Sequence, residues 1–413
     1  MAASGPSHPA GVPDADAPRP GAVLFTAFEP SGDDHAAPVI AEIRARRPDL
    51  TVYAWGGPKM QRAGATVVEF TGQSAVMGLP GPSKIVEHLR LNRRIADWLR
   101  THRVDLHVPV DSPGANFPIC RLTKARGIRV VHLVAPQMWA WGPWRVAKLR
   151  RLTDLVLCLL PFEEQWFRTR GVPARFVGHP LFDEALDVDA VTARAARIPG
   201  SNAKPRVLLL PGSRPSEISR CFPVLLDAFR RLRHDFPGLV GCVASTRHQV
   251  EADIRGLAQS RGGWPDGLSV VVGDTDAAIA WSEVALVVSG TVTLQIARQR
   301  RPMVAMYRPG KLVYHALARW LVSTPLFTLP NLIAGRGVIP EFIPHFGDGE
   351  ALAVAVIRLL RQPGLQETQV AALEEVCARF RGLSAARTAA DEILRALDGS
   401  PARAPAVPVP VTA

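Results

Sequence analysis

Short apolar runs alternate with amphipathic stretches along most of the chain, and this alternation limits the fold more than any other feature. Strands that are buried on both faces read as continuous apolar runs, and the amphipathic helices between them cover the faces of a parallel sheet. We therefore predict a parallel, helix-flanked sheet in the first half. Its expected strands are residues 22–28, 51–55, 105–110, 129–134 and 154–160, with a helix at 34–47.

The alternation restarts after a looser segment. Gly200, Ser201, Asn202 and Pro205 interrupt the pattern, so a domain boundary is expected near residues 185–205. The predicted fold is α/β, with two doubly wound parallel-sheet (Rossmann-like) domains that face a cleft and bind ligands at the carboxyl ends of their strands. In the second half, strands are expected at 207–210, 239–244, 268–272, 284–288 and 303–306, and only helices over 350–397.

Composition agrees with two globular domains. The chain has 413 residues, of which 47% are hydrophobic and 21% charged, which is enough for two hydrophobic cores. Proline-rich residues 1–20 and 399–413 are expected to be disordered tails. No apolar stretch approaches the roughly 20 residues needed to cross a bilayer. The cysteines are scattered without a Cys-x-x-Cys spacing, which favours reduced core cysteines of a cytosolic protein.

The net charge of +12 indicates an anionic partner or simply a basic proteome. Nucleic acid is not expected, because no recognisable nucleic-acid-binding module accompanies the basic residues. An anionic membrane surface is favoured, because Trp139, Trp141 and Trp144 adjoin one basic cluster and Met77 and Leu79 precede another. The alternative is solvated helix faces with buried tryptophans. The basic clusters are residues 90–94, 145–151 and 298–301.

Polar residues follow two predicted strands of the first half. Glu29, Ser31, Gly32 and Asp33 form a strand-to-helix turn that suits an N-cap facing the cleft, with plain capping as the alternative for Asp33. Asp111 stands at the carboxyl end of another strand. Partial burial there would raise the pKa of its carboxyl toward the range of a general base. From position alone, a helix cap is equally consistent.

The second half has a possible phosphate-binding turn at the end of the strand at 207–210. Gly212, Ser213 and Arg214 follow that apolar run, and Glu217 comes one helical turn later. A glycine turn and a guanidinium before a helix are suited to a diphosphate. A salt bridge is the alternative role for Arg214.

Two other polar turns of the second half are expected on the same edge of the sheet. Ser289, Gly290 and Thr291 join a strand to a helix, where free amides and hydroxyls form an anion site. Asn331 and Arg336 lie in the other turn. The recurrence of polar turns on one predicted edge favours a ligand site over isolated caps.

The order of motifs resembles that of the lipid-A-disaccharide synthase family, from about residue 22 to residue 395. The motifs that carry the resemblance are Glu29-Pro30-Ser31-Gly32-Asp33, Gly56-Gly57-Pro58-Lys59-Met60, Ala75-Val76-Met77-Gly78-Leu79, Asp111-Ser112-Pro113, Trp139-Ala140-Trp141, Leu160-Pro161-Phe162-Glu163, Val177-Gly178-His179-Pro180, Leu210-Pro211-Gly212-Ser213-Arg214, Ser289-Gly290-Thr291 and Asn331-Leu332-Ile333-Ala334-Gly335-Arg336.

The resemblance implies a B-type glycosyltransferase with an acceptor and membrane-facing domain at 21–195 and a UDP-sugar domain at 196–349. Helices at 350–398 are expected to return to the first domain. The implied reaction moves 2,3-diacylglucosamine from UDP to 2,3-diacylglucosamine 1-phosphate, forming the β-1,6 disaccharide of lipid A and UDP. No metal or cofactor is implied. The implied location is the cytoplasm, peripheral on the inner membrane of a Gram-negative-type bacterium.

The resemblance also assigns roles to residues. Asp111 is expected to be catalytic, as an inverting general base. The expected acceptor-side residues are Glu29, Ser31, Gly32, Asp33, Met77, Trp139 and Trp141. The expected donor-binding residues are Gly212, Ser213, Arg214, Glu217, Ser289, Gly290, Thr291, Gln295, Asn331 and Arg336.

The chain departs from the family pattern at a few positions. Gly114 stands where a second aspartate is usual, Gly142 where an arginine is usual, and Gln295 where a glutamate is usual. Glutamine can hydrogen-bond a ribose hydroxyl but lacks the charge of a carboxylate. These changes keep two alternatives open, a divergent UDP-sugar transferase or epimerase with another substrate and a non-catalytic homologue.

Overall fold

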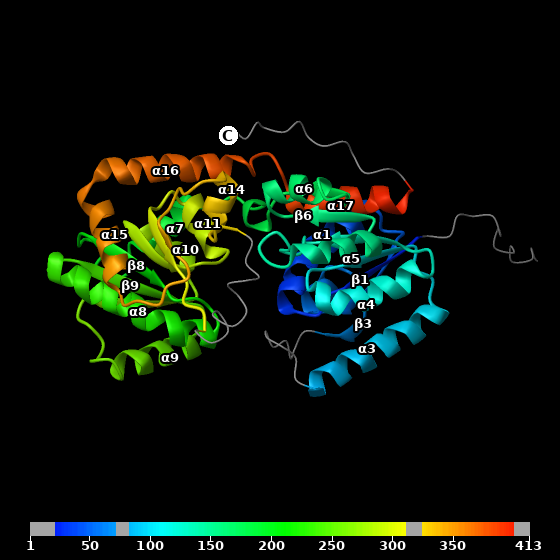
Figure 1. Cartoon of the computed structure of the whole chain (residues 1–413), viewed down its shortest axis with the longest axis horizontal. Coiled ribbons are helices and arrows are strands. Elements are labelled where there is room, and N and C mark those ends of the chain that lie inside the picture. Colours follow the sequence, from blue (N-terminus) through cyan, green and yellow to red (C-terminus); the bar gives the residue numbers. More distant parts are fainter. Residues whose placement is uncertain (1–20, 72–81, 311–323, 400–413) are drawn as a thin grey trace, which may run out of the picture. The chain divides into compact units, whose positions relative to one another are not determined.

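The computed structural model describes residues 21–71, 82–310 and 324–399 (Figure 1). Met77 and Leu79 lie outside these ranges. Contacts divide the chain into two compact units, one with residues up to Val131 together with the helix end from Ile393, and one with His132–Glu392.

The first sheet is parallel, with strand order β3-β2-β1-β4-β5-β6-β7. The division between the two units falls within β5. The strands of this first sheet are β1 (Ala22–Thr26), β2 (Thr51–Gly56), β3 (Thr66–Phe70), β4 (Leu106–Pro109), β5 (Arg129–Leu133), β6 (Leu155–Cys158) and β7 (Ala174–Phe176). The helices in this part are α1 (Pro30–Arg46), α2 (Pro58–Arg62), α3 (Pro82–Thr101), α4 (Pro113–Lys124), η1 (Pro143–Arg145), α5 (Val146–Leu152), α6 (Pro161–Arg168) and η2 (Pro180–Phe182).

The second sheet is also parallel, with order β10-β9-β8-β11-β12-β13. Its strands are β8 (Arg206–Leu210), β9 (Val240–Ser245), β10 (Leu268–Val272), β11 (Val284–Val288), β12 (Met303–Met306) and β13 (Glu341–Phe342). The remaining helices are α7 (Val188–Ala195), α8 (Pro215–Asp235), α9 (His248–Gln259), α10 (Thr275–Trp281), α11 (Val292–Arg298), α14 (Leu329–Ala334), α15 (Glu350–Arg361), α16 (Pro363–Ala378) and α17 (Ala385–Leu397).

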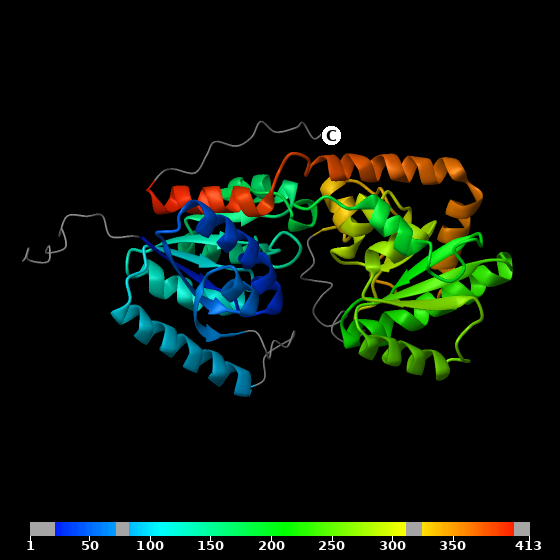
Figure 2. The same cartoon turned by 180° about the vertical axis from the view of Figure 1, so that it is seen from behind.

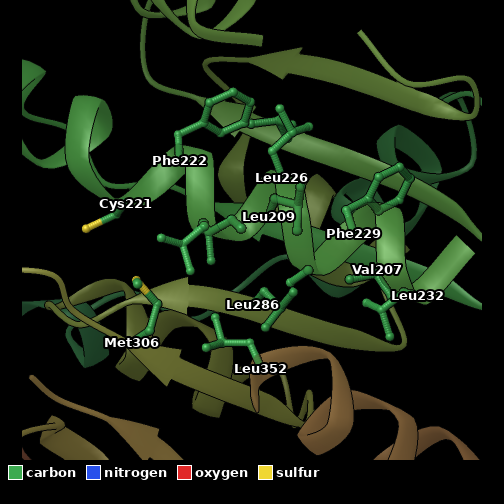
Figure 3. Packing of buried hydrophobic residues seen from close by; sticks show 14 of the residues in the cluster. Val207, Leu209, Cys221, Phe222, Leu226, Phe229, Leu232, Leu286, Met306 and Leu352 are labelled. Carbon is green, nitrogen blue, oxygen red and sulfur yellow. The ribbon is translucent and has the colours of Figure 1, made fainter. Parts of the chain in front are cut away.

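Alternate residues of β8 explain why its sequence is a continuous apolar run. Val207 and Leu209 face the helices α8 and α15, in a cluster that Figure 3 shows from close by. Leu208 and Leu210 face the other layer, which includes α10 and α11. Because both faces of the strand are covered, every residue from 207 to 210 is buried, as expected for a doubly wound sheet. The predicted fold class is therefore confirmed.

The terminal helices include α16, which packs beside α11 and α14 and is drawn in orange in both views (Figures 1 and 2). None of the helices in the described ranges has both the length and the apolar character of a membrane span. All five cysteines are free, and four of them are buried. The predicted core position is confirmed for those four cysteines.

Candidate functional site

The turns that follow β1 and β4 are neighbours, because these strands pair in parallel. Thr26 is the register partner of Pro109, and the backbone N–H of Val110 donates to the carbonyl oxygen of Thr26 at 2.9 Å. Parallel strands bring their carboxyl ends to one edge of the sheet. Glu29 and Asp111 therefore approach each other although they are far apart in sequence.

Asp111 and Ser112 adopt left-handed backbone conformations, with φ of 47° and 36°. Non-glycine residues rarely adopt this region, and such strain is concentrated at functional sites. The Ser112 hydroxyl donates to Oε1 of Glu29 at 2.7 Å. Ser112 occupies the N-cap of α4, and its side chain makes no capping hydrogen bond.

The electrostatics of this turn suit a base. Burial is the main cause that raises the pKa of the Asp111 carboxyl, and the nearby Glu29 charge raises it further. A hydrogen bond from the Ser112 backbone N–H and the charge of His35 lower it in part. Burial lowers the pKa of His35, although the negative charges of Asp111 and Asp34 act to raise it. A half-buried carboxylate with a raised pKa is a stronger base than an ordinary aspartate.

His35 was not among the expected site residues. It lies in the second turn of α1, on the same element as the predicted Ser31 and Gly32. The signal in the sequence was a titratable side chain directly after Asp33 and Asp34, at the start of the helix. That signal is weak, because only the fold shows that His35 shares an environment with Asp111.

Asp33 lies in α1, but its side chain caps the start of α2. Its two carboxylate oxygens accept from the backbone N–H groups of Lys59 at 3.0 Å and Met60 at 2.8 Å, in the first turn of α2. A Cβ on Gly57 would lie 2.3 Å from the Asp33 carboxylate, so this close approach needs glycine. The carboxylate is thus committed to holding α2.

Ser31 and Gly32 belong to the first turn of α1. A Cβ on Gly32 would lie 2.9 Å from the Cβ of Ala27, so glycine lets the helix start close to the end of β1. Ser31 is half-buried there. The turn therefore keeps Glu29 beside the Asp111 turn.

The turn after β8 is built around Gly212, whose φ is 96°. Arg214 is the N-cap residue of α8, and its Nη1 donates to Oε1 of Glu217 at 2.7 Å. The Arg214 side chain is 54% exposed, whereas that of Glu217 is 13% exposed. An exposed ion pair contributes little to stability, so Arg214 can exchange this partner for a ligand phosphate at low cost. Ser213 lies within the same turn.

The turns after β11 and β12 lie at the same edge, since β8, β11 and β12 pair in parallel. Ser289 is half-buried, and Gly290 and Thr291 are exposed at the start of α11. Gln295 is half-buried one turn further along α11. Gly290 and Thr291 offer exposed backbone and a hydroxyl group to an anion, whereas the backbone N–H of Ser289 donates to the Met306 carbonyl oxygen at 3.0 Å.

Tyr307 and Arg220 at this edge were missed in the sequence. Tyr307 follows the carboxyl end of β12, and its hydroxyl is hydrogen-bonded to Arg220 of α8. The pKa of Tyr307 is raised by burial and by the charge of Glu217. An arginine inside a long amphipathic helix gave no signal, because its position beside the strand ends depends on helix packing.

Asn331 is buried, and both polar atoms of its side chain are hydrogen-bonded within the protein. Its Oδ1 accepts from the backbone N–H groups of Val338 at 2.7 Å and Ile339 at 2.9 Å, and its Nδ2 donates to the Ile339 carbonyl at 3.0 Å. Arg336 is exposed and donates to Glu375 at 3.1 Å. Asn331 thus shapes the loop after α14, and a direct bond to a ligand would compete with these interactions.

The three tryptophans near the second basic cluster have different environments. Trp139 is 8% exposed, and its indole N–H donates to Oε1 of Glu163 at 2.9 Å. Trp141 and Trp144 are 51% and 64% exposed, and the Arg145 guanidinium lies 4.2 Å from the Trp141 ring centroid. Trp139 therefore belongs to the core, and only Trp141 and Trp144 are available to an outside partner.

In the described ranges, no cluster of three or more histidine, cysteine, aspartate or glutamate residues is placed to hold a metal ion.

Comparison with known proteins first defines the class. The chain resembles the structure titled as a glycotransferase of kitacinnamycin, with a TM-score of 0.61 and 17% identity over 92% of this chain and 100% of that one. It also resembles a putative UDP-N-acetylglucosamine 2-epimerase from Listeria monocytogenes, with a TM-score of 0.57 and 12% identity over 92% and 96% of the two chains. The fold is thus that of B-type glycosyltransferases and related epimerases.

Sequence comparison then identifies the family. The sequence model of the lipid-A-disaccharide synthetase family matches residues 23–392. A lipid-A-disaccharide synthase of Azotobacter vinelandii is 38% identical over 379 residues, which cover 90% of this chain and 97% of the relative. The chain therefore belongs to the lipid-A-disaccharide synthase family of glycosyltransferases.

Proposed function

We propose that this enzyme transfers 2,3-diacylglucosamine from UDP to 2,3-diacylglucosamine 1-phosphate, forming a β-1,6-linked disaccharide and releasing UDP. The observation that carries the mechanism is the Asp111 turn, in which a half-buried carboxylate with a raised pKa stands at the end of β4. Family membership supports the substrates. Under this proposal, residues 21–195 bind the acceptor and residues 196–349 bind the donor.

Asp111 is the proposed general base. Its carboxylate removes the proton from the acceptor 6-hydroxyl while that oxygen attacks the anomeric carbon of the donor sugar. The bond between the anomeric carbon and the phosphate oxygen breaks, and UDP leaves with the electron pair. Attack opposite to the leaving group inverts the configuration. Glu29 keeps the base effective, because its charge raises the pKa of Asp111.

The proposed leaving-group site is the edge formed by the turns after β8 and β11. Arg214 exchanges Glu217 for the diphosphate, and the backbone amides near Gly290 and Thr291 supply further donors. Preorganised donors of this kind stabilise charge as it develops on a leaving group. Gln295 faces the ribose in this proposal, and Asn331 supports the neighbouring loop.

We also propose that the enzyme works on the cytoplasmic surface of the inner membrane. Exposed Trp141 and Trp144 next to Arg145 and Lys148 offer aromatic and cationic contacts to an anionic lipid surface. Acylated substrates would reach the enzyme from that surface.

The proposal is tested with purified protein, UDP-diacylglucosamine and diacylglucosamine 1-phosphate. We expect equimolar UDP and disaccharide from the wild type. Asp111→Asn should keep donor affinity and lower turnover by roughly 100-fold or more, because it removes the base without changing the side-chain volume. Asp97→Asn, which changes an exposed aspartate of α3 paired with Arg100, is the matched control and should have full activity. Retention of most activity by Asp111→Asn would show that another group is the base.

A further inference from the structure

Four polar side chains lie buried next to the Asp111 turn. They are Thr26 on β1, His107 on β4, and Asn116 and Thr123 on α4, and each is 0% exposed. Burial of polar groups is costly unless they are hydrogen-bonded. None of the four has a role in the proposed chemistry of the site.

These side chains form one continuous series of hydrogen bonds. The Thr26 hydroxyl lies 2.9 Å from Nε2 of His107 and donates to Oδ1 of Asn116 at 2.6 Å. Nδ1 of His107 lies 3.0 Å from the Thr123 hydroxyl. Nδ2 of Asn116 donates to the carbonyl oxygens of Val110 at 3.0 Å and Asp111 at 2.9 Å. The series thus ends on the backbone of the proposed base.

The proton positions in this series follow from the partners. Backbone carbonyls only accept, so Nδ2 of Asn116 must face Val110 and Asp111 and its Oδ1 must face Thr26. Thr26 gives its single hydroxyl proton to that Oδ1, so Nε2 of His107 must be the donor to Thr26. The Thr123 hydroxyl donates to the carbonyl oxygens of Ile119 at 3.2 Å and Cys120 at 3.1 Å, so the partners do not fix the direction of its link to Nδ1 of His107. The links from His107 through Thr26 and Asn116 to the Asp111 turn each have one direction, and loss of one of them leaves the next group unsatisfied.

The last link explains how Asp111 and Ser112 can hold left-handed backbone angles without glycine. Both hydrogens of one amide group are used on two successive carbonyls at the start of that turn. Strained backbone persists only where surrounding bonds over-determine it. The Asn116 amide is such a constraint, and Thr26 and His107 fix its orientation.

We propose that Thr26, His107 and Asn116 are positioning residues that hold the Asp111 carboxylate in its reactive, half-buried orientation. The inference rests on the proposed role of Asp111 as the base. It adds to the Asp111 turn the buried side chains of β1, β4 and α4 that support it. None of the three residues contacts substrate in this proposal.

Thr26→Val tests the inference, since it removes the hydroxyl at nearly constant volume. We expect kcat to fall about 10-fold with the KM for the donor unchanged, while Thr26→Ser keeps near-wild-type turnover. The acid limb of the pH–rate profile should move to lower pH, because a relaxed turn exposes the carboxylate to water. Glu29 and His35, the other titratable groups acting on Asp111, are unchanged in this variant.

A double-mutant cycle separates positioning from general destabilisation. If Thr26 acts through Asp111, Thr26→Val should cause no further loss of turnover in the Asp111→Asn background. Thr153→Val is the matched control, because Thr153 is a buried threonine whose hydroxyl donates to the Leu149 carbonyl oxygen of α5. An equal loss in both backgrounds, or an unchanged kcat and pH profile for Thr26→Val, would overturn the inference.

A second pair of variants covers the case in which Thr26→Val does not fold. His107→Gln keeps a donor near the Nε2 position and should retain turnover, whereas His107→Leu should lose it. The carboxyl titration of Asp111, followed by NMR with 13C-labelled aspartate and assigned with Asp111→Asn, needs no substrate. A lower pKa of Asp111 in Thr26→Val supports the inference even if the wild type makes no disaccharide, and an unchanged pKa contradicts it.

Discussion

At the level of single residues, Arg214 provides the most direct test of the donor half. Arg214→Ala should weaken UDP binding by about 1.5 to 3 kcal/mol, the range for a hydrogen bond to a charged group. Its exposed pair with Glu217 is worth little, so stability should hardly change. Calorimetric titration with UDP measures the effect, and Arg231→Ala, an exposed ion-paired arginine on the same helix, is the control. Unchanged UDP affinity would make Arg214 a structural residue.

Gln295 is the second residue whose role can be measured. Gln295→Glu should place a charged acceptor near the ribose hydroxyls and tighten UDP by about 1 kcal/mol, since charge-assisted hydrogen bonds are roughly twice as strong as neutral ones. Repulsion from the diphosphate opposes this gain. Titration with uridine, which lacks the diphosphate, isolates the ribose term. If uridine binds the variant and the wild type equally, Gln295 does not contact the ribose.

Residue roles could be predicted from the sequence only as far as position at a strand end determines them. Asp111 was placed correctly at the end of β4, but its left-handed backbone depends on bonds from Asn116 that only the fold reveals. Asp33 and Asn331 look available for ligands in the sequence. In the structure their polar atoms are committed to α2 and to the loop after α14, because distant backbone amides reach them.

At the level of secondary structure, strands buried on both faces were predictable and marginal ones were not. β8 and β11 are continuous apolar runs, and their predicted bounds agree with the structure to within a residue. β3 was missed because it alternates exposed and half-buried residues, and β13 because it contains only two residues. Their formation depends on pairing with a neighbouring strand, which local sequence does not encode.

Glu163, at the start of α6, is a titratable group that connects this helix to Trp139 by a hydrogen bond. Burial raises the pKa of Glu163 to about 7, although hydrogen bonds from Trp139 and from the backbone N–H of Leu160 act to lower it. The folded protein thus binds a proton that the unfolded chain releases at lower pH. The resulting stabilisation is fully present below pH of about 4.5 and is lost as pH rises through about 7.

Glu163→Gln should remove this pH dependence. Between pH 5 and pH 8, the free energy of unfolding of the wild type should fall relative to the variant by on the order of 3 kcal/mol. Urea denaturation at intervals across this range measures the difference. Parallel pH curves for the two proteins would show that Glu163 titrates in the folded protein as it does in the unfolded chain.

At the level of the whole molecule, net charge and exposed tryptophans are the two features behind the proposed membrane contact. A charge of +12 attracts the protein to any anionic surface, but that attraction is screened by salt and is not specific to lipid. Insertion of aromatic side chains into the headgroup region is insensitive to salt. Binding that persists at high salt therefore reports on the tryptophans, and the salt-sensitive part reports on the charge.

We expect the double variant Trp141→Ser, Trp144→Ser to bind vesicles of phosphatidylglycerol and phosphatidylethanolamine about 10-fold more weakly than the wild type. The part of the binding that persists in 0.5 M salt should be abolished. The reason is that each indole buried in the membrane contributes on the order of 1 kcal/mol or more. Both side chains are exposed, so the fold should be preserved. Val188→Ser with Val354→Ser removes two other exposed apolar side chains and should leave binding unchanged. Vesicle co-sedimentation measures all three proteins. Equal binding by the tryptophan variant at high salt would assign the membrane contact to another surface, and loss in the valine control would show that exposed apolar area acts without regard to position.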